Sequence, residues 1–391
     1  MLISLLLATI GNVGLWSVIA IMPAVQAEFG IDRAAVSLLF SMTMIGFAAG
    51  NFLLGWLVDK RGVMHVILFS GIVVSGSYAL SAYATSVVSL AALQLLIGFG
   101  GGASFGPLLA DISQWFLRRR GLAVAIVASG NYLSGAIWPM ALSGVLENDG
   151  WRQVHLWLAV IAALVMVPLA FGLRRRLPEA ASQAAAALAQ DAAARTSLSP
   201  RALQWILALA GVGCCVAMSM PQVHLVALCV DYGFGTAVGT QMLSLMLLGG
   251  VVSRLCSGLL VDWMGAVKTV LLGSILQCLA LALYLPSSTL PSLFIVSMIF
   301  GLSQGGIVPG YALIIREYLP PKEAGARVGL VMMATIFGMA FGGYVSGEIF
   351  DLTGSYQAAF LHGILWNILN ILLLLFVLWR AMGPVRRQAP A

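Results

Sequence analysis

The sequence predicts an all-α polytopic membrane protein with twelve transmembrane helices in two pseudo-symmetric six-helix bundles. Of the 391 residues, 61% are hydrophobic and 9% are charged, whereas soluble globular chains carry about 25% charged residues. The mean hydropathy is +1.00. Apolar runs divide the chain into twelve stretches that each reach the length of a spanning helix, about 20 residues. These observations exclude a soluble enzyme, a disordered chain and a nucleic-acid binder, despite a pI near 9.2.

Charged residues, proline and glycine mark the ends of each predicted span. The first six cover residues 2–26, 34–57, 64–83, 87–114, 121–146 and 152–173. The last six cover residues 202–229, 236–261, 267–286, 291–315, 325–350 and 357–380. The one long polar segment lies between them. We therefore predict an N-terminal bundle over residues 1–173, a cytoplasmic linker over 174–201 and a C-terminal bundle over 202–391. The first residues, MLISLLLATIGNVGLW, lack the charged leader of a signal peptide and are read as the start of the first span.

The charges predict the orientation of the spans, because basic residues near spans concentrate on the cytoplasmic side. With both termini inside, seventeen of the 20 basic residues lie on that side: Lys60, Arg61, Arg118, Arg119, Arg120, Arg174, Arg175, Arg176, Arg195, Arg201, Lys268, Arg316, Lys322, Arg327, Arg380, Arg386 and Arg387. Most of the acids lie outside, together with Arg33 and Arg152: Glu28, Asp32, Glu147, Asp149, Asp231 and Asp351. The remaining basic residue, Arg254, falls within the eighth span.

Several kinds of chemistry have no signature in the sequence. The five cysteines lie in or beside apolar stretches without metal-ligand spacing, which predicts free thiols and no metal site. No nucleotide-binding loop of the GxxxxGK[ST] kind is present, so we expect no ATP drive. The glycine run at residues 98–102 is interpreted as a helix-packing surface. We expect neither a cofactor nor an enzymatic activity.

A short motif recurs at the same place in both predicted bundles. GWLVDKRG closes the second span at residues 55–62, and GLLVDWMG closes the eighth at residues 258–265. Gly, Leu, Val, Asp and Gly recur at an offset of 203 residues. Parallel six-span repeats are typical of transporters whose binding site lies between the halves, near the middle of the membrane.

These repeated motifs resemble the loop signature of the major facilitator superfamily, and the resemblance covers essentially the whole chain. It implies a cytoplasmic latch that holds the two halves together in the outward-open state. The implied gating residues lie in or near the loops that follow the second, fourth and eighth spans: Asp59, Arg61, Asp111, Arg118, Arg119, Arg120 and Asp262. In the C-terminal motif, Trp263 and Met264 replace the family's usual basic residues, which implies a weaker latch there.

A narrower resemblance concerns the monocarboxylate and oxalate–formate transporter branch. It is carried by GLWSVIAIMPAVQAEFG in the first span, WFLRRRGLAVAIVASG entering the fifth, PQVHLVALCVDYG in the seventh and SRLCSGLLVDWMG in the eighth. That branch is similar in placing an arginine in the eighth span, which Arg254 matches. The oxalate–formate type also implies a lysine in the eleventh span, which is absent here. One buried cation suits a monocarboxylate better than a dicarboxylate.

Arg254 is the first candidate for substrate binding. A central arginine costs roughly 2.5–3.5 kcal/mol on insertion scales, and its guanidinium can hold a carboxylate through two parallel hydrogen bonds. A structural tie to a helix carbonyl or to a buried acid is the alternative. His224, beside Gln222 in the seventh span, is the candidate proton carrier and a further anion ligand. The alternative for His224 is a neutral side chain bonded to a neighbouring helix.

Other polar and aromatic residues could complete a cavity between the bundles. They lie in the first, fifth and tenth spans: Asn12 and Trp16 at helical spacing, the neighbours Asn131 and Tyr132, and Gln304 and Tyr311 seven residues apart. Each of them could instead be a helix-packing residue. The spacing of seven residues between Gln304 and Tyr311 predicts that they share one face of a continuous helix.

The sequence therefore predicts a secondary active transporter for a small organic anion, with a monocarboxylate and protons as partners. Alternating access would occur in a monomer within a bacterial inner membrane, with both termini cytoplasmic. An efflux antiporter for drugs or metabolites, an organic-anion exchanger and a non-transporting receptor or scaffold are the alternatives. The choice between symport and exchange stays open at this stage.

Overall fold

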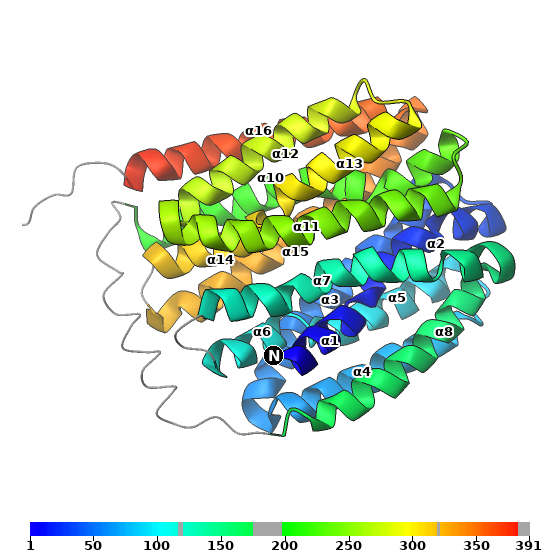
Figure 1. Cartoon of the computed structure of the whole chain (residues 1–391), viewed down its shortest axis with the longest axis horizontal. Coiled ribbons are helices and arrows are strands. Elements are labelled where there is room, and N and C mark those ends of the chain that lie inside the picture. The colour runs from blue at the N-terminus through cyan, green and yellow to red at the C-terminus, as the bar shows by residue number, and fades with distance from the viewer. Residues whose placement is uncertain (116–119, 175–197, 319–320, 382–391) are drawn as a thin grey trace, which may run out of the picture.

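The computed structural model describes residues 1–115, 120–174, 198–318 and 321–381, and the regular elements in these ranges are α-helices (Figure 1). Twelve helical stretches among these residues are long and apolar enough to cross a membrane, which confirms the predicted number of spans. The first six spans, here called the N half, contain α1 Leu2–Gly11, α2 Val13–Phe29, α3 Arg33–Arg61, α4 Val63–Ser81, α5 Val87–Gly102, α6 Gly106–Trp115, α7 Arg120–Ala141 and α8 Ser143–Phe171.

The last six spans, here called the C half, contain α10 Pro200–Asp231, α11 Thr236–Met264, α12 Ala266–Tyr284, α13 Leu290–Gln304, α14 Ile307–Tyr318, α15 Pro321–Thr353 and α16 Tyr356–Ala381. The helices run roughly parallel to the long axis in Figure 1. We call the side where α8 ends and α10 begins the linker side. The side where α10 ends and α11 begins is called the distal side. Residues 175–197 of the predicted linker lie outside the described residues.

Three spans that the sequence predicts as continuous are broken into two helices. The first breaks at Asn12, whose Nδ2 donates to the Ala8 carbonyl at 2.6 Å and so competes with the helical hydrogen bonds. The fourth breaks at residues 103–105, after three consecutive glycines. The tenth breaks at Gly305 and Gly306. Such breaks leave backbone polar groups that side chains must satisfy, and in transporters discontinuous helices typically line the binding site.

The turn between the fifth and sixth spans also differs from the prediction. A new helix begins at Ser143, before the predicted end of the fifth span at residue 146. Gly150, at φ 80° and ψ 173°, then bends the chain into the sixth span. A residue with a side chain rarely adopts this φ, which explains why glycine occupies the turn.

Two pairs of long unbroken helices join the halves: α3 packs along α15, and α7 packs along α11. Within each half, glycines let helix backbones approach closely. A Cβ atom on Gly98 of α5 would lie 2.0 Å from the Thr43 carbonyl oxygen of α3, and one on Gly301 of α13 would lie 1.9 Å from that of Met246 of α11. Side chains larger than glycine would therefore push these helices apart.

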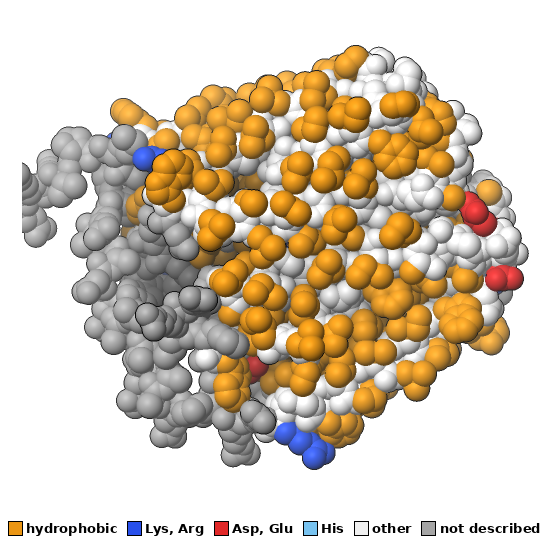
Figure 2. Space-filling model, viewed as in Figure 1, with side chains coloured by type: hydrophobic (Ala, Val, Ile, Leu, Met, Phe, Trp, Pro, Cys, Tyr) orange, Lys and Arg blue, Asp and Glu red, His pale blue; other side chains and the backbone are white. Residues whose placement is uncertain are grey.

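The surface matches a bilayer environment. Large apolar side chains are exposed along the spans, among them Val88 at 80%, Leu164 at 70% and Leu259 at 70%. Hydrophobic side chains cover the middle of the face in Figure 2, acidic side chains appear at its right-hand end, and basic side chains lie toward the left and the lower edge together with a further small acidic patch. The chain is thus a multi-pass integral membrane protein with twelve spans.

Candidate functional site

Arg254 is 5% exposed, and its guanidinium lies between the two halves. α11 carries it ten residues before its end at Met264, which is about 15 Å along the helix. Nε donates to the carbonyl oxygen of Gly305 at 3.0 Å, within the C half. Nη1 donates to the carbonyl oxygen of Ala128 on α7, across the interface, at 2.7 Å. The predicted alternative, a tie to helix carbonyls, therefore describes the contacts that Arg254 makes here.

None of the carboxylates that the structure describes forms an ion pair with Arg254; the two ion pairs among these residues involve Arg33 and Arg152. The guanidinium also lies over the aromatic ring of Tyr132, whose centroid is 4.1 Å from Cζ. Backbone carbonyls and an aromatic face solvate a cation but do not neutralise it. A positive charge thus lies buried between the halves.

The break in the tenth span is held by two adjacent residues of α11. Ser253 Oγ accepts a hydrogen bond from the Gly305 amide at 3.1 Å, and Arg254 Nε donates a hydrogen bond to the Gly305 carbonyl oxygen. Gln304, just before the break, accepts a hydrogen bond at Oε1 from Gln222 Nε2 of α10 at 2.5 Å. Gln304 Nε2 is buried, and no acceptor lies within reach of it among the described residues. The Gln304 side chain thus has an unused hydrogen-bond donor, one residue before the Gly305 carbonyl that Arg254 binds.

The structure brings four predicted residues of the N half together. Trp16 Nε1 donates to the carbonyl oxygen of Asn131 at 2.8 Å, and Asn131 Nδ2 lies 3.4 Å from Asn12 Oδ1. The Trp16 and Tyr132 rings pack with centroids 6.1 Å apart. Asn12 Nδ2 also reaches the Ser104 carbonyl oxygen at 3.4 Å, which links the breaks of the first and fourth spans. Together with Gln304 and Arg254 of the C half, these four residues form what we call the central cluster: Asn12, Trp16, Asn131, Tyr132, Gln304 and Arg254.

Tyr311 lies elsewhere. Its hydroxyl donates to Asn370 Oδ1 of α16 at 2.6 Å, in a polar network within the C half. The prediction that Tyr311 and Gln304 share one face assumed a continuous helix. That premise is wrong, because Gly305 and Gly306 interrupt the helix between them.

His224 is fully buried near the distal end of α10. Its Nε2 lies 2.8 Å from the carbonyl oxygen of Gly343 on α15, and Nδ1 lies 3.5 Å from the Tyr356 hydroxyl of α16. A carbonyl only accepts hydrogen bonds, so Nε2 carries a hydrogen, and the lone pair of Nδ1 in the neutral ring can accept a hydrogen bond from the Tyr356 hydroxyl. His224 is thus bonded to neighbouring helices of its own half, and the structure does not place it within the central cluster.

Sequence reasoning missed a group of charges that joins the halves on the distal side. Arg33 at the start of α3 pairs with Asp231 at the end of α10, with Nη2 3.0 Å from each carboxylate oxygen. Asp351 of α15 accepts hydrogen bonds from the backbone amides of Arg33 and Ala34, at 3.0 and 2.7 Å. An acid from the C half thereby caps a helix N-terminus of the N half. We call Arg33, Asp231 and Asp351 the distal gate.

The latch residues on the linker side fall largely outside the described part of the chain. This holds for residues 118 and 119 and for the side chains of Asp59, Arg120 and Asp262. Arg61 is exposed at the end of α3. Asp111 is half-buried in α6, where desolvation raises the pKa of its carboxyl above the usual value. The predicted latch stays a prediction.

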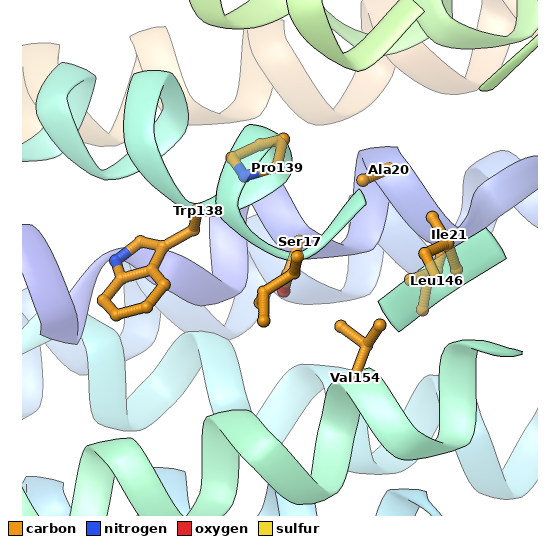
Figure 3. Close-up of a pocket in the computed structure, with 8 residues that line it drawn as sticks. Ser17, Ala20, Ile21, Trp138, Pro139, Leu146 and Val154 are labelled. Carbon is orange, nitrogen blue, oxygen red and sulfur yellow. The ribbon is translucent and has the colours of Figure 1, made fainter. Parts of the chain in front are cut away.

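A small crevice, whose lining does not include Arg254, lies between α2, α7 and α8 (Figure 3). Apart from Ser17 its lining is apolar, with Trp138, Pro139 and Val154 among the lining residues. Its interior volume is about 10 Å³, which is enough for about one water molecule, so it is too small to be the substrate site. No group of three or more potential metal ligands occurs among the described residues.

Comparison with known proteins places the chain among transporters. The Major Facilitator Superfamily profile matches residues 2–290 and 238–391. Monocarboxylate transporter 13 of Rattus norvegicus is 28% identical over 85% of this chain and 78% of its own length. The agnestins efflux protein AgnL12 of Paecilomyces divaricatus is 22% identical over 90% of this chain and 80% of its own. A crystal structure of a bacterial homologue of the human lysosomal transporter Spinster matches with a TM-score of 0.73 at 14% identity, covering 100% of this chain and 98% of that one.

Proposed function

Because the chain belongs to the Major Facilitator Superfamily, and is thus a secondary transporter rather than an enzyme, we propose that it carries a small organic anion of the monocarboxylate class. Transport would be coupled to protons and would proceed by alternating access between the N half and the C half. The charge asymmetry of the sequence supports an orientation with both termini cytoplasmic, and we propose that the protein acts as a monomer in a bacterial inner membrane. The distal side then faces the outside.

The observation that carries this proposal is the buried charge of Arg254. Its described partners are the carbonyls of Gly305 and Ala128 and the ring of Tyr132, all of them neutral. A substrate carboxylate would supply the missing negative charge through the fork of the guanidinium. The unused amide of Gln304 offers a donor to a second polar group of the substrate. The relationship to a monocarboxylate transporter supports the same substrate class.

Thermal unfolding of the purified protein tests the proposal. We expect acetate, pyruvate, lactate or benzoate to raise the unfolding temperature, because a ligand at a hundred times its Kd stabilises the native state by about 2.7 kcal/mol. Acetamide and benzamide, which lack the charge, should have no effect, and succinate should have less effect than a monocarboxylate. Equal stabilisation by an acid and its amide would refute anion recognition.

An efflux antiporter or an organic-anion exchanger is the second candidate. The fungal relative named as an efflux protein favours outward transport of a metabolite. The same thermal screen separates the classes, since stabilisation by bulky neutral or cationic compounds, with none by carboxylates, would favour drug or metabolite efflux. Flux measured in both directions across vesicles then distinguishes uptake from efflux.

His224→Gln tests proton coupling. A glutamine amide can still donate to the Gly343 carbonyl, as Nε2 does at 2.8 Å, but it takes up no proton at the position of Nδ1. We propose that His224, whose Nδ1 lies 3.5 Å from the Tyr356 hydroxyl, carries the coupled proton. The variant should then lose uptake driven by a pH gradient far more than exchange of substrate between the two sides. Equal loss of both activities would assign His224 a structural or binding role.

A further inference from the structure

The partners of Arg254 come from both halves of the protein. Gly305 belongs to the C half, whereas Ala128 and Tyr132 belong to α7 of the N half. Each partner is part of the chain itself, so none of them depends on a substrate being bound. The interface between α7 and α11 therefore contains a built-in set of neutral ligands for the buried cation.

The ring of Tyr132 is positioned for this contact from both sides. On α11, Gly250 and Arg254 are four residues apart and so lie on one helix face. A Cβ atom on Gly250 would lie 3.0 Å from the ring, so the absence of a side chain lets the ring lie against α11. On the N-half side, Trp16 packs against the ring and is itself fixed by its hydrogen bond to Asn131.

Resting on the proposed function, we infer that Tyr132 and the Ala128 carbonyl act as a substitute for substrate, which lets the empty carrier reorient and so makes transport net rather than obligatory exchange. In any alternating-access carrier the halves close over the site during the return step. If the cation were enclosed without partners during this step, the free-energy barrier to reorientation of the empty carrier would rise, because burying an unpaired charge is costly. A carrier without substitute ligands would return only when loaded. Here α7 supplies them, and Tyr132 is a positioning residue for the cation.

The inference predicts a slow return when the ring is removed. A desolvated cation–π contact is worth roughly a thirtyfold change in an equilibrium, so Tyr132→Leu should slow reorientation of the empty carrier by about tenfold or more. Tyr132→Phe keeps the ring and removes only the phenol hydroxyl, so it should slow reorientation much less than Tyr132→Leu does. Comparing the two variants distinguishes the contribution of the phenol hydroxyl from that of the aromatic ring.

A cysteine reporter on the distal side measures this rate without any substrate. Ser37 of α3 is fully buried beneath the distal gate, and its Oγ lies 2.9 Å from the position of a Cβ on Gly347 of α15. Ser37→Cys should react with a membrane-impermeant maleimide only when the halves part on that side. Vesicles lacking the reporter give the background from the native cysteines. The reaction rate in carboxylate-free buffer then reports opening of the empty carrier.

A double-mutant cycle separates the proposed role from general packing. Tyr132→Leu should slow labelling in the parent but not in an Arg254→Leu background, where no cation needs a partner. Labelling of Tyr132→Leu at the parental rate, equal slowing by Tyr132→Phe, or equal slowing in both backgrounds would each overturn the inference.

Flux measurements distinguish this inference from the proposed function. With a carboxylate that the parent protein carries, the ratio of net efflux to exchange should fall about tenfold in Tyr132→Leu. Parental exchange without net efflux would refute the inference and leave anion transport intact. If the cysteine reporter is labelled at the expected rates in all variants but no carboxylate is bound or carried, the proposed substrate class would be refuted instead.

Discussion

Arg254→Ala is expected to weaken binding of small monocarboxylates by about 10- to 150-fold, the effect of losing a charge-assisted contact worth roughly 1.5–3 kcal/mol. The side chain makes no ion pair among the described residues, so its removal strands no buried acid there. Two backbone carbonyls, of Gly305 and Ala128, lose their partner. We therefore expect the protein to fold and insert, with the loss concentrated in affinity.

Arg254→Lys is the matched variant for this prediction. Lysine keeps the charge but replaces the planar fork by a single ammonium group, so it should bind carboxylates with an affinity between that of the parent and that of the alanine variant. The measurement is ligand-induced stabilisation of all three proteins by a carboxylate and by its uncharged amide. If Arg254→Ala still distinguishes acid from amide as the parent does, Arg254 is not the anion anchor.

Asp231→Asn is expected to open the distal side. The substitution keeps the shape of the side chain but removes the charge that holds Arg33, which is 7% exposed. Losing this charge-assisted bond between the halves should shift the conformational equilibrium by about 10- to 150-fold toward states open on the distal side. The Ser37→Cys reporter should then react faster with an impermeant maleimide added from that side.

Glu28→Gln provides the control, because it breaks the other ion pair on the same side of the molecule. Glu28 and Arg152 both belong to the N half, and their side chains are 41% and 38% exposed. An exposed pair within one half contributes little to stability and does not join the halves, so this variant should label like the parent. Unchanged labelling of Asp231→Asn would show that the ion pair does not hold the distal side closed.

The spans could be predicted from the sequence because hydropathy and segment length depend on the local chain. Arg254 was recognisable for the same reason, since a cation inside an apolar run stands out. The distal gate was not recognisable. Arg33, Asp231 and Asp351 each lie at the end of a span, where a solvated charge is ordinary, and only the tertiary structure brings the ends of α3, α10 and α15 together.

The helix breaks were missed for a different reason. Asn12 and the pair Gly305 and Gly306 lie in runs whose hydropathy continues across them, so segment prediction passes through them. What ends the helices is a specific partner for the backbone, such as Ser253 and Arg254 at Gly305. At Gly305 that partner comes from another span and is not visible in a linear pattern. The expectation that Gln304 and Tyr311 share one helix face depended on the same unbroken helix.

The broken spans also have a mechanical consequence. A continuous α-helix resists bending, because its hydrogen bonds stiffen the whole length. The contacts between the halves are made chiefly by unbroken helices, α3 with α15 and α7 with α11, which act as stiff levers. The first, fourth and tenth spans each contain a joint near their middle. In each broken span, the helix on one side of the break can therefore bend independently of the helix on the other side, while the unbroken helices move as rigid units. Opening on the distal side need not strain the linker side.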